Sequence, residues 1–113
     1  MNGPAVFLHV AASEADAGPA LRELRAGLEE EGVPCRLRVV EGDAATIAWI
    51  AARASPVSVG IGLDAESVCL HLPQLAPESP LLRLPVDHLP ERLRALGHNA
   101  ARLVKGAPLK ELP

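Results

Sequence analysis

Three consecutive carboxylates form the most prominent candidate binding group in this sequence. Glu29, Glu30 and Glu31 occur in the stretch LRAGLEEEGVP, where Gly32 is predicted to end a helix. Carboxylates at the carboxyl end of a helix face the negative end of its dipole. This electrostatic penalty is modest when the carboxylates are exposed to water, but a cation or a basic group would stabilise them. The glutamates therefore indicate either a solvated surface or a site for a positive partner.

Helical geometry gives the three glutamates different surroundings. The apolar stripe of the same helix is formed by Leu21, Leu24 and Leu28. Glu31 lies at the edge of that stripe, whereas Glu29 follows Arg25 by one turn and can pair with it. Glu30 points away from the leucines, and the small residue Gly27 near it cannot neutralise its charge. We therefore predict that Glu30 is an unpaired carboxylate on a face that another surface can approach closely.

Other residues with catalytic potential occur singly. The four histidines are His9, His71, His88 and His98, and they form no Ser-His-acid grouping. Asp64 follows a predicted strand, where a turn cap is the simplest role for a lone acid. Cys35 and Cys69 lack CxxC spacing, so we expect them to be reduced and packed. The sequence therefore predicts a non-catalytic protein.

Composition argues against several classes of ligand. The chain has 113 residues, a net charge of −3, one Phe, one Trp and no Tyr. It therefore lacks the basic stripe and stacking rings that nucleic-acid binding needs. No apolar run approaches the roughly 20 residues that cross a membrane, so we expect a cytoplasmic protein. The segment AASEADAGPA, after the first predicted strand, is acidic where a nucleotide-binding loop would be rich in glycine.

The pattern of apolar runs predicts one α/β domain over residues 1–113. Strands are expected at residues 5–11, 35–41, 57–64, 67–72 and 81–85, with helices near 18–31, 42–56 and 88–106. Strands that alternate with helices favour a parallel sheet covered on both faces, and the short gap after the third strand favours a hairpin. We expect a three-layer, Rossmann-like domain without a nucleotide-binding loop. Its sheet would be mixed, mostly parallel, with four or five strands.

Small and apolar residues suggest where these elements pack. Gly60 and Gly62 lie within a predicted strand, which is typical of close packing rather than of a phosphate loop. Ile47 and Ile50 are expected on the buried face of the second helix. Gly97 marks either a break or a close-packing point in the last helix.

Three blocks of sequence carry a family resemblance. They are GLEEEGVPCRL (27–37), AWIAARASPVSVGIGLD (48–64) and GHNAARLVKGAPLKEL (97–112). Their order and spacing resemble the small subunit of the diol/glycerol dehydratase-reactivating factors, whereas residues 65–96 are less typical. The resemblance implies a subunit that is not itself an enzyme. It also implies a large-subunit partner with an actin-like ATPase core.

The resemblance further implies a chaperone cycle and an interface. In that family the complex releases damaged cobalamin from an adenosylcobalamin-dependent dehydratase by subunit exchange. A glutamate matching Glu30 helps to ligate Mg²⁺ at the contact with the large subunit, and a hard cation suits such a ligand. No cofactor is expected on this chain alone. The other candidate interface residues are Glu29, Glu31, Asn99, Arg102 and Lys105.

Two other functions stay open at this point. One is a structural subunit of the cobalamin-dependent dehydratase itself, which has a similar fold but is typically longer. The other is a small-molecule-binding α/β domain, against which the missing phosphate loop counts. The sequence does not decide between diol and glycerol systems or between cytosol and a bacterial microcompartment. It is also compatible with self-association of the isolated chain.

Overall fold

A mixed five-stranded sheet forms the centre of the protein, with strand order β2-β1-β3-β4-β5. The computed structural model describes residues 4–11 and 18–111. The strands are β1 (Val6–Ala11), β2 (Cys35–Val40), β3 (Gly60–Leu63), β4 (Ser67–His71) and β5 (Leu82–Pro85). β1 pairs in parallel with β2 and β3, whereas β4 pairs antiparallel with β3 and β5. The predicted mixed sheet is confirmed, with as many antiparallel pairs as parallel ones.

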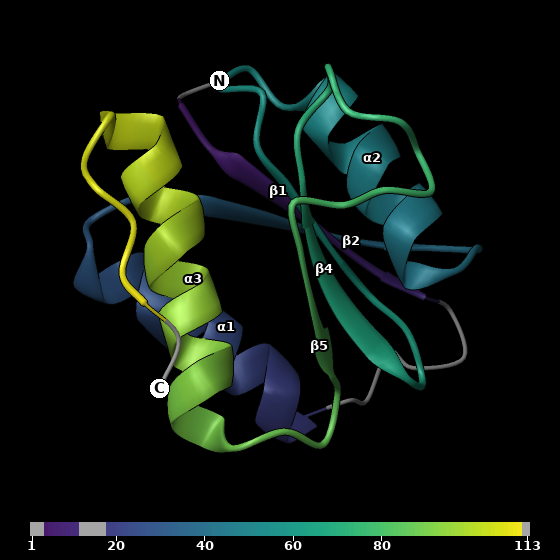
Figure 1. Ribbon diagram of the computed structural model, residues 1–113, viewed down its shortest axis with the longest axis horizontal. Coiled ribbons are helices and arrows are strands. Elements are labelled where there is room, and N and C mark those ends of the chain that lie inside the picture. The colour runs from purple at the N-terminus through teal and green to yellow at the C-terminus, as the bar shows by residue number, and fades with distance from the viewer. Residues whose placement is uncertain (1–3, 12–17, 112–113) are drawn as a thin grey trace.

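Helices cover both faces of this sheet (Figure 1). They are α1 (Gly18–Glu30), α2 (Ala44–Ala54) and α3 (Pro90–Lys105). α2 covers one face, and α1 and α3 lie side by side on the other, so the predicted three layers are confirmed. The acidic segment after β1 lies outside the described residues. Within the described part of the chain, no helix is long and apolar enough to cross a membrane.

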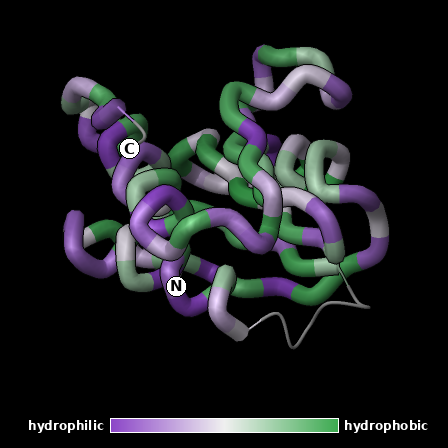
Figure 2. The backbone as a smooth tube through the Cα atoms, turned by 60° about the horizontal axis from the view of Figure 1, so that its bottom comes forward, coloured by the Kyte–Doolittle hydropathy of each residue, from purple (hydrophilic) through white to green (hydrophobic). Residues whose placement is uncertain are grey.

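The larger part of the core lies between the sheet and the pair formed by α1 and α3. Its fully buried side chains include Val6, Leu8, Val10, Leu24, Leu28, Ile61, Leu63, Leu70 and Leu96. Burial of each large aliphatic side chain contributes about 1.5–3 kcal/mol. Hydrophobic and hydrophilic residues alternate along the chain, as amphipathic helices and strands require (Figure 2). Aliphatic side chains therefore fill the core of this protein, which has very few aromatic residues.

Glycines in β3 bring α2 close to the opposite face of the sheet. A Cβ atom at Gly60 or Gly62 would collide with the α2 backbone, which confirms that these glycines serve packing. The buried residues of α2 are mostly alanines, together with Ile47. The prediction that Ile50 is buried is wrong, since 47% of it is exposed. The alanines that fit against the glycines determine which side of α2 faces inward, and Ile50 lies on the outer side.

A pair of glycines allows equally close contact between α1 and α3. A Cβ atom at Gly27 would collide with the carbonyl of Arg94, and one at Gly97 would collide with the carbonyl of Leu24. α3 continues through Gly97, so this glycine is a close-packing point and not a break. Each helical glycine costs about 0.5–1 kcal/mol relative to alanine. The contact between the two backbones offsets that cost.

Because α1 and α3 are in close contact at Gly27, a single methyl group added there should reduce the stability of the fold. We expect Gly27→Ala to lower the free energy of unfolding by about 1–3 kcal/mol, because the added Cβ forces α1 and α3 apart. Urea denaturation measures this change. Gly18→Ala is the matched control and should not lower stability, because its added Cβ meets no described residue within 4 Å apart from its chain neighbours. Equal losses in both variants would contradict the assigned role of Gly27.

Candidate partner-binding site

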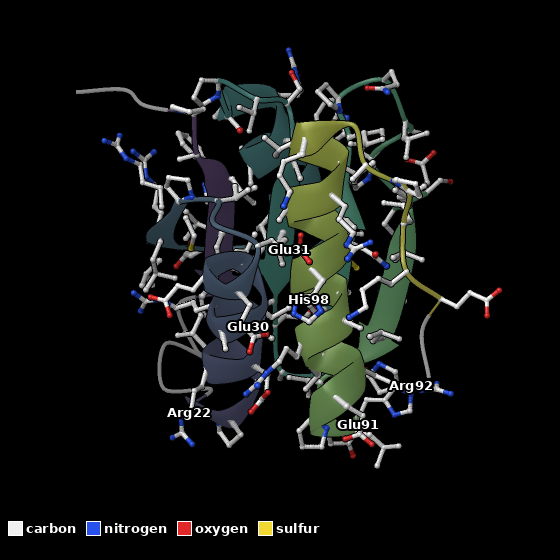
Figure 3. All side chains as sticks on the ribbon, turned by 90° about the vertical axis from the view of Figure 1, so that its left-hand side faces the viewer. Arg22, Glu30, Glu31, Glu91, Arg92 and His98 are labelled. Carbon is white, nitrogen blue, oxygen red and sulfur yellow. The ribbon has the colours of Figure 1, made fainter. Side chains whose placement is uncertain are left out.

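The glutamates at the end of α1 meet basic residues of α3 in the same chain. The two helices run side by side, and Glu30, Glu31 and His98 lie between them (Figure 3). Arg22, Glu91 and Arg92 lie towards the other end of the helix pair. The residues of α3 that approach the glutamates are Arg94, His98, Arg102 and Lys105. They lie on one side of α3 because their spacing is close to one helical turn.

Glu30 is not unpaired, which corrects the sequence prediction. His98 Nε2 donates to its Oε1 at 2.7 Å, and Arg94 Nη1 lies 3.4 Å from its Oε2. The hydrogen bond from His98 is the main reason that the pKa of Glu30 is lowered. The small residue Gly27 does admit another surface, but that surface is α3 of the same chain. Half of the Glu30 side chain remains exposed.

Glu31 is held more firmly than Glu30. Lys105 Nζ donates to its Oε1 at 2.7 Å and to its backbone carbonyl at 3.0 Å, and Arg102 Nε donates to its Oε2 at 3.3 Å. The hydrogen bond from Lys105 is the main reason that the pKa of Glu31 is lowered. Arg102 and Lys105, predicted as interface groups, therefore also hold the end of α1 against α3. Lys105 in addition satisfies a carbonyl that the helix leaves free.

Glu29 lies apart from this cluster. It is exposed, and among the described residues it makes no ion pair with Arg25 or any other cation. Glu29 and Arg25 line a hollow between α1 and the start of β2, beside Cys35. The three consecutive glutamates thus divide into two that face α3 and one that faces β2.

Asn99 anchors the segment that follows α3. Its side chain is buried, donates to the carbonyl of Lys110 at 3.0 Å and accepts from the backbone N–H of Lys110 at 2.7 Å. Arg102 Nη1 also donates to the carbonyl of Pro108. Residues 107–111 consequently fold back along α3 (Figure 1). This arrangement brings Lys110 Nζ to 3.0 Å from His98 Nδ1.

Sequence reasoning missed Arg94, His98 and Lys110 as members of this site. A signal for two of them was present, since Arg94, His98 and Arg102 recur every four residues and define one stripe of α3. The stripe alone does not show which helix it faces. Lys110 carries no local signal, because its position depends on the hydrogen bonds between its backbone and Asn99.

Two of the remaining candidate residues, Asp64 and His71, hold backbone groups in place. Asp64 accepts from the backbone N–H of Ala44 at the start of α2 and from that of Ser67 in the hairpin, each at 2.8 Å, as predicted for a turn cap. Buried His71 bonds to the backbone carbonyl of Pro77. Neither Cys35 nor Cys69 forms a disulfide, and burial raises the pKa of Cys69 to about 11. In the described part of the chain, no cluster of three or more His, Cys, Asp or Glu residues could hold a metal by itself.

Comparison with known proteins first defines a broad class. The family model described as dehydratase medium subunit matches residues 3–110. Two solved structures share this fold. One, described as glycerol dehydratase reactivase, has a TM-score of 0.91 at 41% identity and covers 98% of this chain and 100% of its own. The other, a diol dehydratase-reactivating factor complexed with ADP and Mg²⁺, has a TM-score of 0.87 at 37% identity, covering 96% of this chain and 99% of its own.

Sequence relatives show which subunit of a reactivating factor this chain is similar to. The diol dehydratase-reactivating factor small subunit of Klebsiella michiganensis is 42% identical over 92 residues, which are 80% of this chain and 74% of the relative. The propanediol dehydratase-reactivating factor small subunit of Salmonella typhimurium is 41% identical over 98 residues, 86% of this chain and 84% of the relative. The chain belongs to the family of diol/glycerol dehydratase-reactivating factor small subunits. The resemblance inferred from the sequence is confirmed.

The contacts of Glu31 predict a dependence of stability on pH. Because its pKa is lowered in the folded state, its ionised form stabilises the fold above the ordinary glutamate pKa of about 4.5. This stabilisation is lost as the pH falls through the lowered pKa. We expect Glu31→Gln to be less stable than the original chain at pH 7, with the difference shrinking below about pH 4.5.

Urea denaturation between pH 7 and pH 3 measures this difference. Glu78→Gln is the control, because Glu78 is exposed in the loop between β4 and β5 and makes no ion pair among the described residues. A gap between the original chain and Glu31→Gln that stays constant across this range would contradict the assigned ion pairs.

Proposed function

We propose that this chain is the non-catalytic small subunit of a reactivating factor that acts on a cobalamin-dependent diol or glycerol dehydratase. In this proposal it binds an ATPase large subunit, and the complex releases damaged cobalamin from the dehydratase by subunit exchange. The observation that carries the proposal is the 37–42% identity to proteins named as small subunits of such factors. The match extends over nearly the whole fold of the reactivase structures.

The internal roles of the chemically active residues support a non-catalytic subunit. Asp64 caps the start of α2, His71 bonds to a backbone carbonyl, and buried Cys69 packs in the interior of the protein. In α/β folds the start of a helix beside the strand ends is a common place for phosphate. A carboxylate there repels phosphate. We therefore assign the ADP of the related complex to its large subunit, and the corresponding ATPase activity to the partner of this chain.

Glu30 is proposed to contribute one ligand to a Mg²⁺ ion that the large subunit completes. Mg²⁺ prefers oxygen ligands and is commonly held by one or two carboxylates. The donor set fits this role. Glu30 is half exposed, its Oε2 has only a long contact to Arg94, and the Nε of Arg94 is engaged with Glu23 at 2.8 Å. A cation at Oε2 would leave the hydrogen bond from His98 in place. Mg²⁺ there would bridge the two subunits through carboxylate oxygens.

The other predicted interface residues differ in how far they reach the surface. Glu29 is exposed, and Arg102 and Lys105 are partly exposed beside Glu31. Rim charges of this kind influence the choice of partner and the rate of association more than the affinity. Asn99 is buried, so we propose that it supports the interface indirectly, through the segment that it anchors.

A structural subunit of the dehydratase is the second candidate function. The description of the family model as dehydratase medium subunit favours it. The chain instead covers the full length of a solved reactivase subunit, which supports the first proposal. Co-purification from its own host separates the two, because a reactivase subunit should be recovered with an ATPase and not as a constant component of active dehydratase.

The proposed metal bridge predicts a loss of affinity. We expect Glu30→Ala to weaken binding of the cognate large subunit about tenfold in the presence of Mg²⁺, because the bridge loses its ligand from this chain. Titration calorimetry with and without Mg²⁺ measures the effect, and the difference between the two conditions should disappear in the variant. Glu78→Ala, which removes an exposed carboxylate elsewhere, is the control. Unchanged affinity in Glu30→Ala would remove Glu30 from the interface.

A further inference from the structure

We propose that the outer edge of β2 is a docking edge, to which a partner protein adds an extended segment of alternating acidic and apolar residues. The proposal goes beyond the proposed function, and its test needs neither the large subunit nor a metal. β2 lies at one end of the strand order, so in the described part of the chain only β1 pairs with it. Addition of a strand to an open sheet edge is a recurring mode of peptide recognition.

The backbone of β2 offers hydrogen-bonding groups along this edge. The N–H of Val6 donates to the carbonyl of Pro34 at 3.1 Å, and Val6 lies beside Cys35 in the parallel register. Every second residue of β2 therefore bonds to β1, beginning with Pro34. The residues between them direct their N–H and carbonyl groups outward, and they are Cys35, Leu37 and Val39. A partner strand can bond to these groups without disturbing the pairing with β1.

The side chains near the middle of β2 are exposed on both faces of the sheet. Leu37 lies on the face of the main core, because it is opposite buried Leu8 in the register, and Val39 shares that face. Leu37 is nevertheless 43% exposed and Val39 52% exposed. Arg36 and Arg38 lie on the other face and are also exposed. The docking edge thus presents an apolar row on one face and a basic row on the other.

The opposite edge of the sheet differs in ways that limit pairing. β5 has four residues, ends at Pro85 and buries Leu84. Short edge strands and proline are common means by which proteins prevent unwanted strand addition. β2 has six residues and no proline. Its only charged side chains are the two arginines, so it remains suited to a strand of opposite charge.

Charge favours a different protein over a second copy of this chain as the occupant. In a two-fold antiparallel pair of β2 edges, centring on Leu37 places Arg36 opposite Arg38 of the other copy. Centring on Arg38 places that residue opposite itself. Like charges directly opposite each other destabilise a strand pair, whereas opposite charges stabilise it. Arg38 makes no ion pair within the described residues, so its charge is available to an acidic side chain of the partner.

A peptide titration of the isolated chain, followed by NMR of its backbone amides, tests the docking edge. We expect acetyl-Glu-Val-Glu-Val-Glu amide, at millimolar concentration, to shift the amide signals of Leu37 and Val39 and to slow their hydrogen exchange. The corresponding Lys-Val-Lys-Val-Lys peptide should bind about tenfold more weakly, because both arginines would then face like charges. The proposal is refuted if the acidic peptide leaves these amides unchanged or if the two peptides bind equally well.

A proline substitution tests the backbone bonds directly. Leu37→Pro removes one outward N–H and keeps the bonds to β1, which the neighbouring residues make. Leu37→Ala is the matched control, since it also loses the leucine side chain but retains the N–H. We expect Leu37→Pro to bind the acidic peptide about tenfold more weakly than Leu37→Ala. Thermal unfolding verifies that both variants fold, and equal affinity of the two folded variants would contradict strand addition.

A charge reversal tests the choice of partner and does not depend on the proline variant. Arg38→Glu should bind the two peptides within about threefold of each other, because its edge carries one charge of each sign. Arg83→Glu makes the same change on β5, at the other end of the sheet, and should keep the preference for the acidic peptide. An unchanged preference in Arg38→Glu would exclude this arginine from the docking edge and overturn the proposal.

Hydrogen exchange of the chain without peptide tests the alternative occupant. We expect exchange at Leu37 and Val39 to be independent of chain concentration. Protection of both amides that increases with concentration, together with a dimer in sedimentation equilibrium, would assign the edge to a second copy and overturn the proposal.

Discussion

Close contact between α1 and α3 is the constraint on which the candidate site depends. Gly27 and Gly97 remove the side chains that would separate the two backbones, so the charged residues that follow along each helix come within reach of one another. Carboxylates that are unfavourable at the end of α1 are then stabilised by basic side chains of α3. The same contact buries the leucines that form the core. Packing and electrostatics therefore support one arrangement of the two helices.

Much of the fold could be predicted because its signals are local. Apolar runs marked the strands, and the stop at Gly32 follows from its positive φ of 74°. The charge partners of Glu30 and Glu31 could not be predicted, because they lie 64–74 residues away along the chain. A helical projection shows which residues share a face but not what covers that face. The prediction that Ile50 is buried was wrong for the same reason, since only the packing of α2 on β3 shows which side of α2 faces inward.

The structure changes the physical basis of the docking hypothesis. Sequence alone suggested that Glu30 attracts a partner because it lacks a counterpart. The structure gives it counterparts, but the closest is a histidine whose other nitrogen faces an ammonium. What distinguishes Glu30 from Glu31 is then the kind of group that holds it. The short contact of Glu31, at 2.7 Å, is with the ammonium of Lys105, whereas that of Glu30, also at 2.7 Å, is with an imidazole; each carboxylate has a longer contact with an arginine.

Asp64 lies where many proteins with a related α/β architecture bind an anion. In enzymes with this topology, a bound anion often bridges the strand ends and the start of a neighbouring helix. Here the side chain of Asp64 makes that bridge, joining the end of β3, the hairpin and α2 through hydrogen bonds of 2.8 Å. The protein thus carries its own permanent substitute for a ligand at this point. Hydrogen bonds from one side chain therefore hold these three segments together within the chain itself.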